Sequence, residues 1–107
     1  MILLTGASGF VGRQVLKEII DRSIDCTIIC RDVDKIHPDQ KKNIKNIIVS
    51  KNIFTESKEW WFDNLNGIDV IIHLAWFVEP GEYLESKKNL ECLIGSLNLA
   101  QAASERK

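Results

Sequence analysis

Three evenly spaced glycines follow directly on the first apolar segment of the chain. Residues 1–4 are apolar, as in a buried strand, and Gly6, Gly9 and Gly12 come next, where a helical pattern begins. Glycine is unfavourable at the start of a helix because it loses more backbone freedom than other residues. The triplet therefore predicts a tight strand–turn–helix unit, in which backbone must approach something closely.

Strand-like and helix-like segments alternate along the rest of the sequence. Strands are expected at 1–4, 26–30, 44–49 and 69–75, and helices at 10–22, 58–65 and 82–105, while 32–43 is only weakly helical. Alternating strands and helices predict a parallel sheet with right-handed crossovers. The expected fold class is α/β, a Rossmann-type parallel sheet of strand order 3-2-1-4 with flanking helices.

The long helix expected at 82–105 carries two apolar stripes. The main stripe comprises Leu90, Leu93, Ile94 and Leu97, and the smaller one Cys92, Ser96, Leu99 and Ala103. Two stripes predict that the helix packs both on the sheet and on a further helix.

Composition narrows the classes of function. The chain has 107 residues, 45% hydrophobic and 27% charged, with a net charge of −1. That length suits one domain, and the balanced charge offers no field that would attract nucleic acid. No apolar run reaches the length of a membrane span, and residues 1–4 lack the basic flank of a signal peptide. Three cysteines without a disulfide pattern fit a reducing, cytoplasmic setting, with Cys26 and Cys30 as small core residues.

The glycine turn is the expected binding site for the pyrophosphate of a dinucleotide. Gly6 permits the sharp turn, a glycine near its apex admits the phosphates, and Gly12 lets helix and strand pack closely. Free N–H groups and the positive end of the helix dipole would face the phosphates. The candidate residues here are Gly6, Ser8, Gly9, Phe10, Val11 and Gly12. The alternative is a tight turn that binds nothing.

Three separated motifs resemble one family. Residues 5–12 (TGASGFVG) resemble the T-G-x-x-G-x-x-G segment of short-chain dehydrogenases/reductases, in the extended group that holds sugar-nucleotide epimerases and dehydratases. Residues 69–75 (DVIIHLA) resemble that group's fourth strand, and residues 89–103 resemble its next helix. The resemblance implies the NAD(P)-binding part of an oxidoreductase or epimerase/dehydratase that uses hydride transfer. It also implies a small-molecule substrate, most commonly a nucleotide sugar.

The end of the second strand bears on the choice between NADP and NAD. An acidic residue there binds the ribose of NAD, whereas an arginine accommodates the 2′-phosphate of NADP. This chain offers both, Arg31 and then Asp32. By analogy with the family Arg31 takes the discriminating position, which favours NADP, with NAD as the alternative. Arg13, in the first helical turn, is a second candidate for the same phosphate.

The resemblance implies further cofactor contacts. Asn52 and Ile53 correspond to the family's adenine-binding pair, in which an aspartate is more common than asparagine. Leu74, Ala75 and Trp76 come at the carboxyl end of the fourth strand, where ligands bind such sheets, and Trp76 replaces a common alanine. Asn89 is expected to steady the backbone near the cofactor, and His73 is interpreted as structural.

The family's catalytic Tyr-x-x-x-Lys pair is matched in this chain by spacing but not by position. Tyr83 and Lys87 have the right spacing, but they follow the fourth strand, whereas the family's pair lies several tens of residues further along. We therefore expect residues 1–107 to be an N-terminal cofactor-binding part that cannot catalyse alone. The apolar edge of the fourth strand would be covered by the long helix, by the rest of a longer protein or by a second copy. The alternatives are a non-catalytic dinucleotide sensor and a fragment without a role of its own.

Overall fold

A parallel sheet organises the first of two units in the structure. The computed structural model describes residues 1–76 and 86–106, and its first unit comprises Met1–Lys51 and Gly67–Ala75. The strands are β1 (Ile2–Thr5), β2 (Cys26–Cys30), β3 (Asn46–Val49) and β4 (Val70–His73). They pair in parallel in the order β3-β2-β1-β4, which confirms the predicted Rossmann-type sheet.

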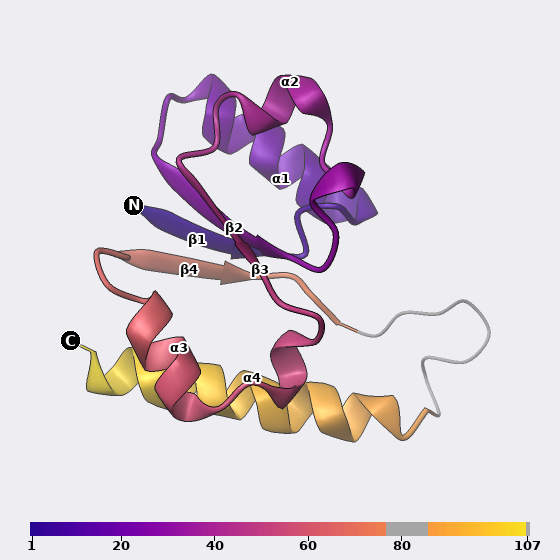
Figure 1. The fold of residues 1–107 in the computed structure, drawn as a ribbon, viewed down its shortest axis with the longest axis vertical. Coiled ribbons are helices and arrows are strands. Elements are labelled where there is room, and N and C mark those ends of the chain that lie inside the picture. Colours follow the sequence, from indigo (N-terminus) through magenta and orange to yellow (C-terminus); the bar gives the residue numbers. More distant parts are fainter. Residues whose placement is uncertain (77–85, 107) are drawn as a thin grey trace. The chain divides into compact units, whose positions relative to one another are not determined.

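Helices connect these strands on one face of the sheet. Helix α1 (Phe10–Asp21) follows β1, and the 3₁₀ helix η1 (Val33–Lys35) and helix α2 (Pro38–Lys41) follow β2. Figure 1 shows α1 and α2 together over the same face. The weakly helical region 32–43 thus forms two short helices, and the third strand starts two residues later than the expected position 44.

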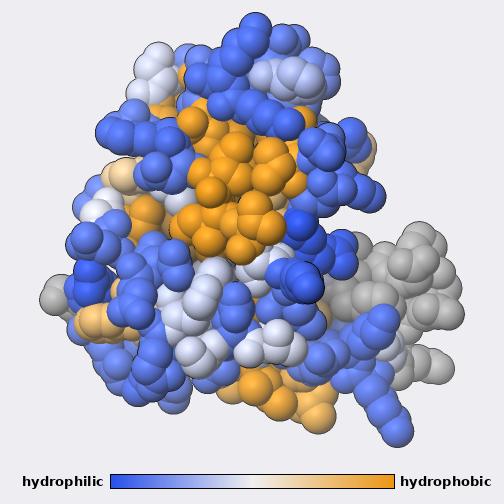
Figure 2. Space-filling model, viewed as in Figure 1, coloured by the Kyte–Doolittle hydropathy of each residue, from blue (hydrophilic) through white to orange (hydrophobic). Residues whose placement is uncertain are grey.

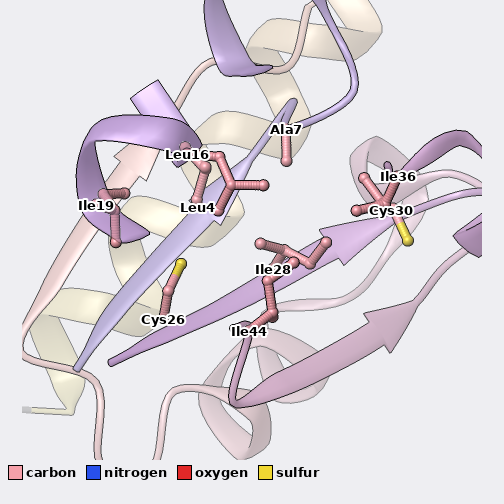
Figure 3. Close-up of a cluster of buried hydrophobic side chains, with 9 residues drawn as sticks. All are labelled: Leu4, Ala7, Leu16, Ile19, Cys26, Ile28, Cys30, Ile36 and Ile44. Atoms are coloured by element: carbon pink, nitrogen blue, oxygen red, sulfur yellow. The ribbon is translucent and has the colours of Figure 1, made fainter. Parts of the chain in front are cut away.

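A hydrophobic core lies between this face of the sheet and α1. Its buried members are Leu4, Ala7, Leu16, Ile19, Cys26, Ile28, Cys30, Ile36 and Ile44 (Figure 3). Cys26 and Cys30 are free thiols within it, as expected of core residues. Burial raises the pKa of Cys26 to about 11, so that thiol stays protonated at neutral pH.

The second unit comprises Asn52–Asn66 and Trp76–Lys107 and is helical where it is described. It contains the 3₁₀ helix η2 (Ile53–Thr55), helix α3 (Lys58–Asn64) and helix α4 (Lys88–Glu105). The predicted start of the long helix at residue 82 lies outside the described residues. Ser86 and Lys87 precede α4 without belonging to it, so its described part begins later than expected.

The prediction that both apolar stripes of α4 pack is wrong for the main stripe, whereas Cys92 and Leu99 of the smaller stripe are buried. The main stripe is exposed, with 61% of Leu90, 48% of Leu93, 52% of Ile94 and 54% of Leu97 accessible. Figure 2 shows apolar atoms over α4 at the bottom of the view. The buried residues are Cys92, Gly95, Leu99 and Ala102, which face α3 and η2.

Small residues explain this outcome. A Cβ atom at Gly95 would lie 2.4 Å from the Cα of Phe54, so the backbones of α4 and η2 are in direct contact. Such an approach requires a small residue at the point of contact, because a larger side chain at position 95 would hold the backbones apart. Hydrophobicity alone therefore does not distinguish the packed stripe of α4 from the exposed one. Within residues 1–76 and 86–106, no helix is both long and apolar enough for a membrane span.

Candidate functional site

The turn between β1 and α1 is shaped by contacts that exclude side chains. Gly6 has φ of +76°, a conformation that glycine adopts without strain. A Cβ at this position would lie 2.8 Å from the backbone nitrogen of Ala75, just beyond β4. Gly6 therefore both turns the chain and lets two strand ends touch, as the sequence predicted for the sharp turn.

Gly12 and Gly9 differ in what surrounds them. A Cβ at Gly12 would lie 1.7 Å from the carbonyl oxygen of Gly6, so internal packing alone demands glycine there. A Cβ at Gly9 would meet only that same oxygen, at an ordinary contact distance of 3.4 Å. The side of Gly9 is thus open, and packing within the described residues does not account for glycine at this position.

The first N–H groups of α1 point to a site for an anion. The N-cap residue Gly9 supplies no side-chain acceptor, and no acidic residue lies in the first turn. Among the described residues, the N–H groups of Phe10, Val11 and Gly12 have no hydrogen-bond acceptor. Ser8, Phe10 and Val11 are exposed around them. Unpaired N–H groups at the positive end of a helix dipole, beside an open glycine, fit a phosphate group.

Thr5 connects the ends of β1 and β4 beneath this turn. Its fully buried hydroxyl accepts hydrogen bonds from the N–H groups of Leu74 (3.1 Å) and Ala75 (3.2 Å). Its oxygen also lies 2.7 Å from Nδ1 of His73. Since two N–H donors occupy both lone pairs of the hydroxyl, its proton is directed to Nδ1, which must be unprotonated. Burial lowers the pKa of His73, in agreement with a neutral ring.

The sequence reasoning named Thr5 only as the start of the glycine motif and missed this role. A threonine at the end of an apolar strand, directly before a glycine, was the available signal. A buried hydroxyl in that place needs partners, and the strand paired beside it is the obvious source. His73 is a partner of this hydroxyl, which supports its interpretation as a structural residue.

Arg31 and Asp32 lie at the end of β2. Because Thr5 pairs with Ile29, the chain beyond Ile29 leaves the sheet at the same edge as the glycine turn. Both side chains are exposed. The carboxylate of Asp32 accepts a hydrogen bond from the N–H of Asp34 at 2.9 Å, whereas the guanidinium of Arg31 has no ion pair or hydrogen bond within the described residues.

Leu74 and Ala75 complete the edge of the first unit. Leu74 is partly exposed, and Ala75 is the small residue that Gly6 contacts. The structure therefore brings together ten of the candidates at the carboxyl end of one sheet. These are Gly6, Ser8, Gly9, Phe10, Val11, Gly12, Arg31, Asp32, Leu74 and Ala75.

The other four candidates belong to the second unit. Asn52 caps η2 by accepting a hydrogen bond from the N–H of Phe54 at 3.0 Å, and Ile53 is buried. Trp76 donates from Nε1 to the Oδ1 of Asn89 at 2.7 Å, and its ring meets Phe54 edge to face. Asn89 thus holds a tryptophan side chain, a contact that the sequence did not reveal.

The Tyr-x-x-x-Lys match lies partly outside the described residues, so its rejection stays a prediction. Tyr83 lies outside the described residues, and Lys87 is the exposed residue directly before α4. Residues 1–76 and 86–106 contain no group of three or more histidine, cysteine or acidic side chains placed to hold a metal ion.

Comparisons with known proteins agree on one family. The model of the NAD dependent epimerase/dehydratase family matches residues 2–107. Epimerase family protein SH2119 of Staphylococcus haemolyticus (strain JCSC1435) is 31% identical over 88 residues, which is 82% of this chain and 26% of that protein.

Solved structures share the fold. The UDP-N-acetylglucosamine 4-epimerase of Bacillus cereus has a TM-score of 0.71 and 24% identity, over 98% of this chain and 35% of its own. MoeE5 in complex with UDP-glucose and NAD has a TM-score of 0.71 and 20% identity, over 98% of this chain and 32% of its own. The chain therefore spans about a quarter to a third of the length of these relatives.

Proposed function

The chain belongs to the NAD dependent epimerase/dehydratase family, and from this premise we propose that its glycine turn binds the pyrophosphate of a nicotinamide dinucleotide. The open side of Gly9 beside the unpaired N–H groups of Phe10, Val11 and Gly12 carries the proposal. These groups would donate to phosphate oxygens, and Ser8 would border them. A bound nicotinamide dinucleotide supplies a carbon that accepts and returns a hydride.

We propose that the cofactor is NADP rather than NAD. The unpaired, exposed guanidinium of Arg31 supports this choice, because its planar donors match a 2′-phosphate. Arg13, exposed in the first turn of α1, is a second cation on the same unit. The alternative, NAD, would leave Arg31 without an ionic partner.

Titration calorimetry with NADPH and NADH tests both proposals. The wild-type chain should bind NADPH more tightly, and Arg31→Ala should weaken NADPH roughly tenfold while leaving NADH unchanged or tighter. Arg22→Ala is the matched control, because Arg22 lies beyond the other end of α1, in an exposed pair with Glu18. The absence of binding at millimolar cofactor would refute the dinucleotide site, and equal losses for both cofactors would refute the phosphate assignment.

The remaining candidates would hold the rest of the cofactor. Leu74 and Ala75 form a partly exposed apolar surface, and the small side chain of Ala75 would leave room for a dinucleotide to cross the sheet edge. We assign Asn52 and Ile53 to the adenine end, and Trp76, held by Asn89, to the nicotinamide or substrate end. These assignments follow the family analogy, and variants at Asn52 and Trp76 in the same titration test them.

For the longer protein that its relatives represent, we propose an NADP-dependent oxidoreductase or nucleotide-sugar epimerase/dehydratase. The family and the UDP-sugar epimerases among the structural neighbours favour an enzyme over the non-catalytic sensor module, which no observation supports. Incubation of such a protein with UDP-glucose or UDP-N-acetylglucosamine, followed by proton NMR of the sugar, tests the activity. An unchanged sugar in the presence of tightly bound cofactor would favour the sensor.

Cytoplasmic location and pairing of two copies through α4 or the edge of β4 stay predictions. Sedimentation velocity tests the pairing, since the exposed stripe of α4 gives a direct variant. Leu93→Glu should shift a dimer to monomer, whereas a monomeric wild-type chain would contradict the pairing.

A further inference from the structure

We propose that Asp32 is a positioning residue for Arg31 and not a ligand of the ribose. In this account the carboxylate fixes the backbone that follows β2, and Arg31 rather than Asp32 distinguishes the two cofactors. The inference rests on the proposed binding of a nicotinamide dinucleotide at the glycine turn. It resolves a conflict within the sequence, because adjacent residues at this strand end point to different cofactors.

Both acceptor groups of Asp32 are used to begin η1. Its Oδ1 accepts the N–H of Asp34 at 2.9 Å, and its backbone carbonyl accepts the N–H of Lys35 at 3.2 Å. Its backbone is extended, with φ of −139° and ψ of 113°, as an N-cap requires. One oxygen of the carboxylate is thereby committed to the turn, which gives Asp32 a structural role that does not depend on a ligand.

The segment that carries Arg31 is anchored at both ends in one hydrophobic cluster. Cys30 precedes it and Ile36 ends it, and only 8% and 2% of these side chains are exposed. Figure 3 shows the two side chains next to one another. The chain must leave the sheet and return within residues 31–35, and the Asp32 cap sets the turn by which it does so. Losing the cap would therefore free the backbone at Arg31 without unseating the core.

Charge supports the same division of roles. The guanidinium of Arg31 has no partner among the described residues, although two carboxylates follow it at Asp32 and Asp34. Those carboxylates oppose a phosphate electrostatically. Removing either charge should thus favour NADPH slightly, and only removal of the cap acceptor should weaken it.

Four variants separate the cap from the charge. Asp32→Asn keeps an oxygen that can accept the N–H of Asp34 but removes the charge. Asp32→Ala removes both, and Asp34→Ala removes a similar charge from an exposed residue without touching the cap. Arg31→Ala reports on the discriminating cation itself. Affinity for NADPH and for NADH is measured by calorimetry on residues 1–107, with thermal unfolding of each variant alongside.

The proposal predicts that Asp32→Asn and Asp34→Ala bind NADPH as tightly as wild type, or up to about threefold tighter. Asp32→Ala should bind NADPH about fivefold more weakly than Asp34→Ala, with NADH unchanged in every Asp variant. A loss of NADH affinity in Asp32→Asn would mean that the carboxylate binds the ribose. That arm decides the question even where Asp32→Ala fails to fold.

Two other results would also overturn it. Equal NADPH affinity in Asp32→Ala and Asp34→Ala would show that the cap has no effect on Arg31. A wild-type chain that binds neither cofactor would refute the proposed function, and this inference with it. Wild-type binding combined with either of the former results would refute the inference alone.

Discussion

Two glycines, one in the turn after β1 and one in α4, solve the same packing problem in different surroundings. A methyl group at Gly12 would collide with the carbonyl of Gly6, and one at Gly95 would collide with the backbone of Phe54. In both places backbone meets backbone, and glycine is required by contacts within the chain. Around Gly95 nothing further needs explanation, because the contact simply joins α4 to η2.

The turn differs because it contains a third glycine that packing does not require. Gly9 has an ordinary extended conformation, with φ of −77°, and a Cβ there would meet only the carbonyl oxygen of Gly6, at 3.4 Å, with the space around it otherwise open. Unpaired N–H groups adjoin that space, whereas the buried face of α4 is closed by η2 and α3. Where other atoms of the protein occupy the space beside a glycine, the glycine serves packing. Where that space is open and unpaired N–H groups adjoin it, the glycine indicates a ligand site.

Alanine at the two packed glycines, Gly12 and Gly95, should give the largest loss of stability, and a small loss at both would break the comparison. Gly12→Ala should lower the free energy of unfolding by about 3 kcal/mol or more, because its Cβ overlaps backbone that cannot move aside. Gly95→Ala should also destabilise, by roughly 1–3 kcal/mol. Urea unfolding of each variant, followed by circular dichroism, measures these changes.

Gly9→Ala is the control for both. Its stability should change by only about 0.5–1 kcal/mol, the difference between glycine and alanine at an N-cap, while NADPH affinity falls at least about tenfold. An alanine at this position that binds NADPH normally would contradict the assignment of Gly9 to the ligand.

The second prediction concerns the two faces of α4. Leu99, of which 4% is exposed, should cost about 2–3 kcal/mol when replaced by alanine, whereas Leu97, 54% exposed, should cost less than about 0.5 kcal/mol. The same residue type on the same helix makes the pair a matched control. A larger loss for Leu97→Ala than for Leu99→Ala would contradict the assignment of the buried face of α4.

The third and smallest predicted effect is a dependence of the free energy of unfolding on pH, which comes from His73 next to the glycine turn and not from α4. Burial lowers the pKa of His73 below its ordinary value of 6.5, so the folded chain holds the ring neutral. The unfolded chain takes up a proton first as pH falls, and stability present above about 6.5 is lost below it. Protonation would also oblige the Thr5 hydroxyl to turn away from Nδ1.

Urea unfolding between pH 7.5 and 5.5 measures this loss. His73→Gln should flatten the pH dependence, while His37→Gln, which replaces an exposed histidine, should keep it. Identical pH dependence in wild type and His73→Gln would exclude His73 as the source.

The sequence predicted best where the constraint is local. The apolar run at 26–30 forms β2 with the expected bounds, and the glycine spacing predicted the turn after β1, since both depend on adjacent residues. The face of α4 could not be predicted, because η2, more than thirty residues earlier, decides which side must be small.

The candidate site shows the same limit. The sequence correctly predicted that Arg31, Asp32 and Asn52 follow strand ends. It did not predict which groups Asp32 and Asn52 contact. Asp32 and Asn52 each accept an N–H two residues ahead and begin a 3₁₀ helix. An Asp or Asn after a strand has this capping tendency from its short side chain alone, so the signal for the caps was available, while the cofactor contacts of both residues stay predictions.

The central claim, that a nicotinamide dinucleotide binds at the open glycine turn, is tested most directly by NMR. A ¹⁵N-labelled chain is titrated with NADPH while its backbone amide shifts are followed. The account predicts saturable shifts for the amides of residues 6–12 and for Arg31, with the amides around Ala102 in α4 unchanged. Unmoved amides in residues 6–12 at millimolar NADPH, or saturable shifts confined to other residues, would contradict it.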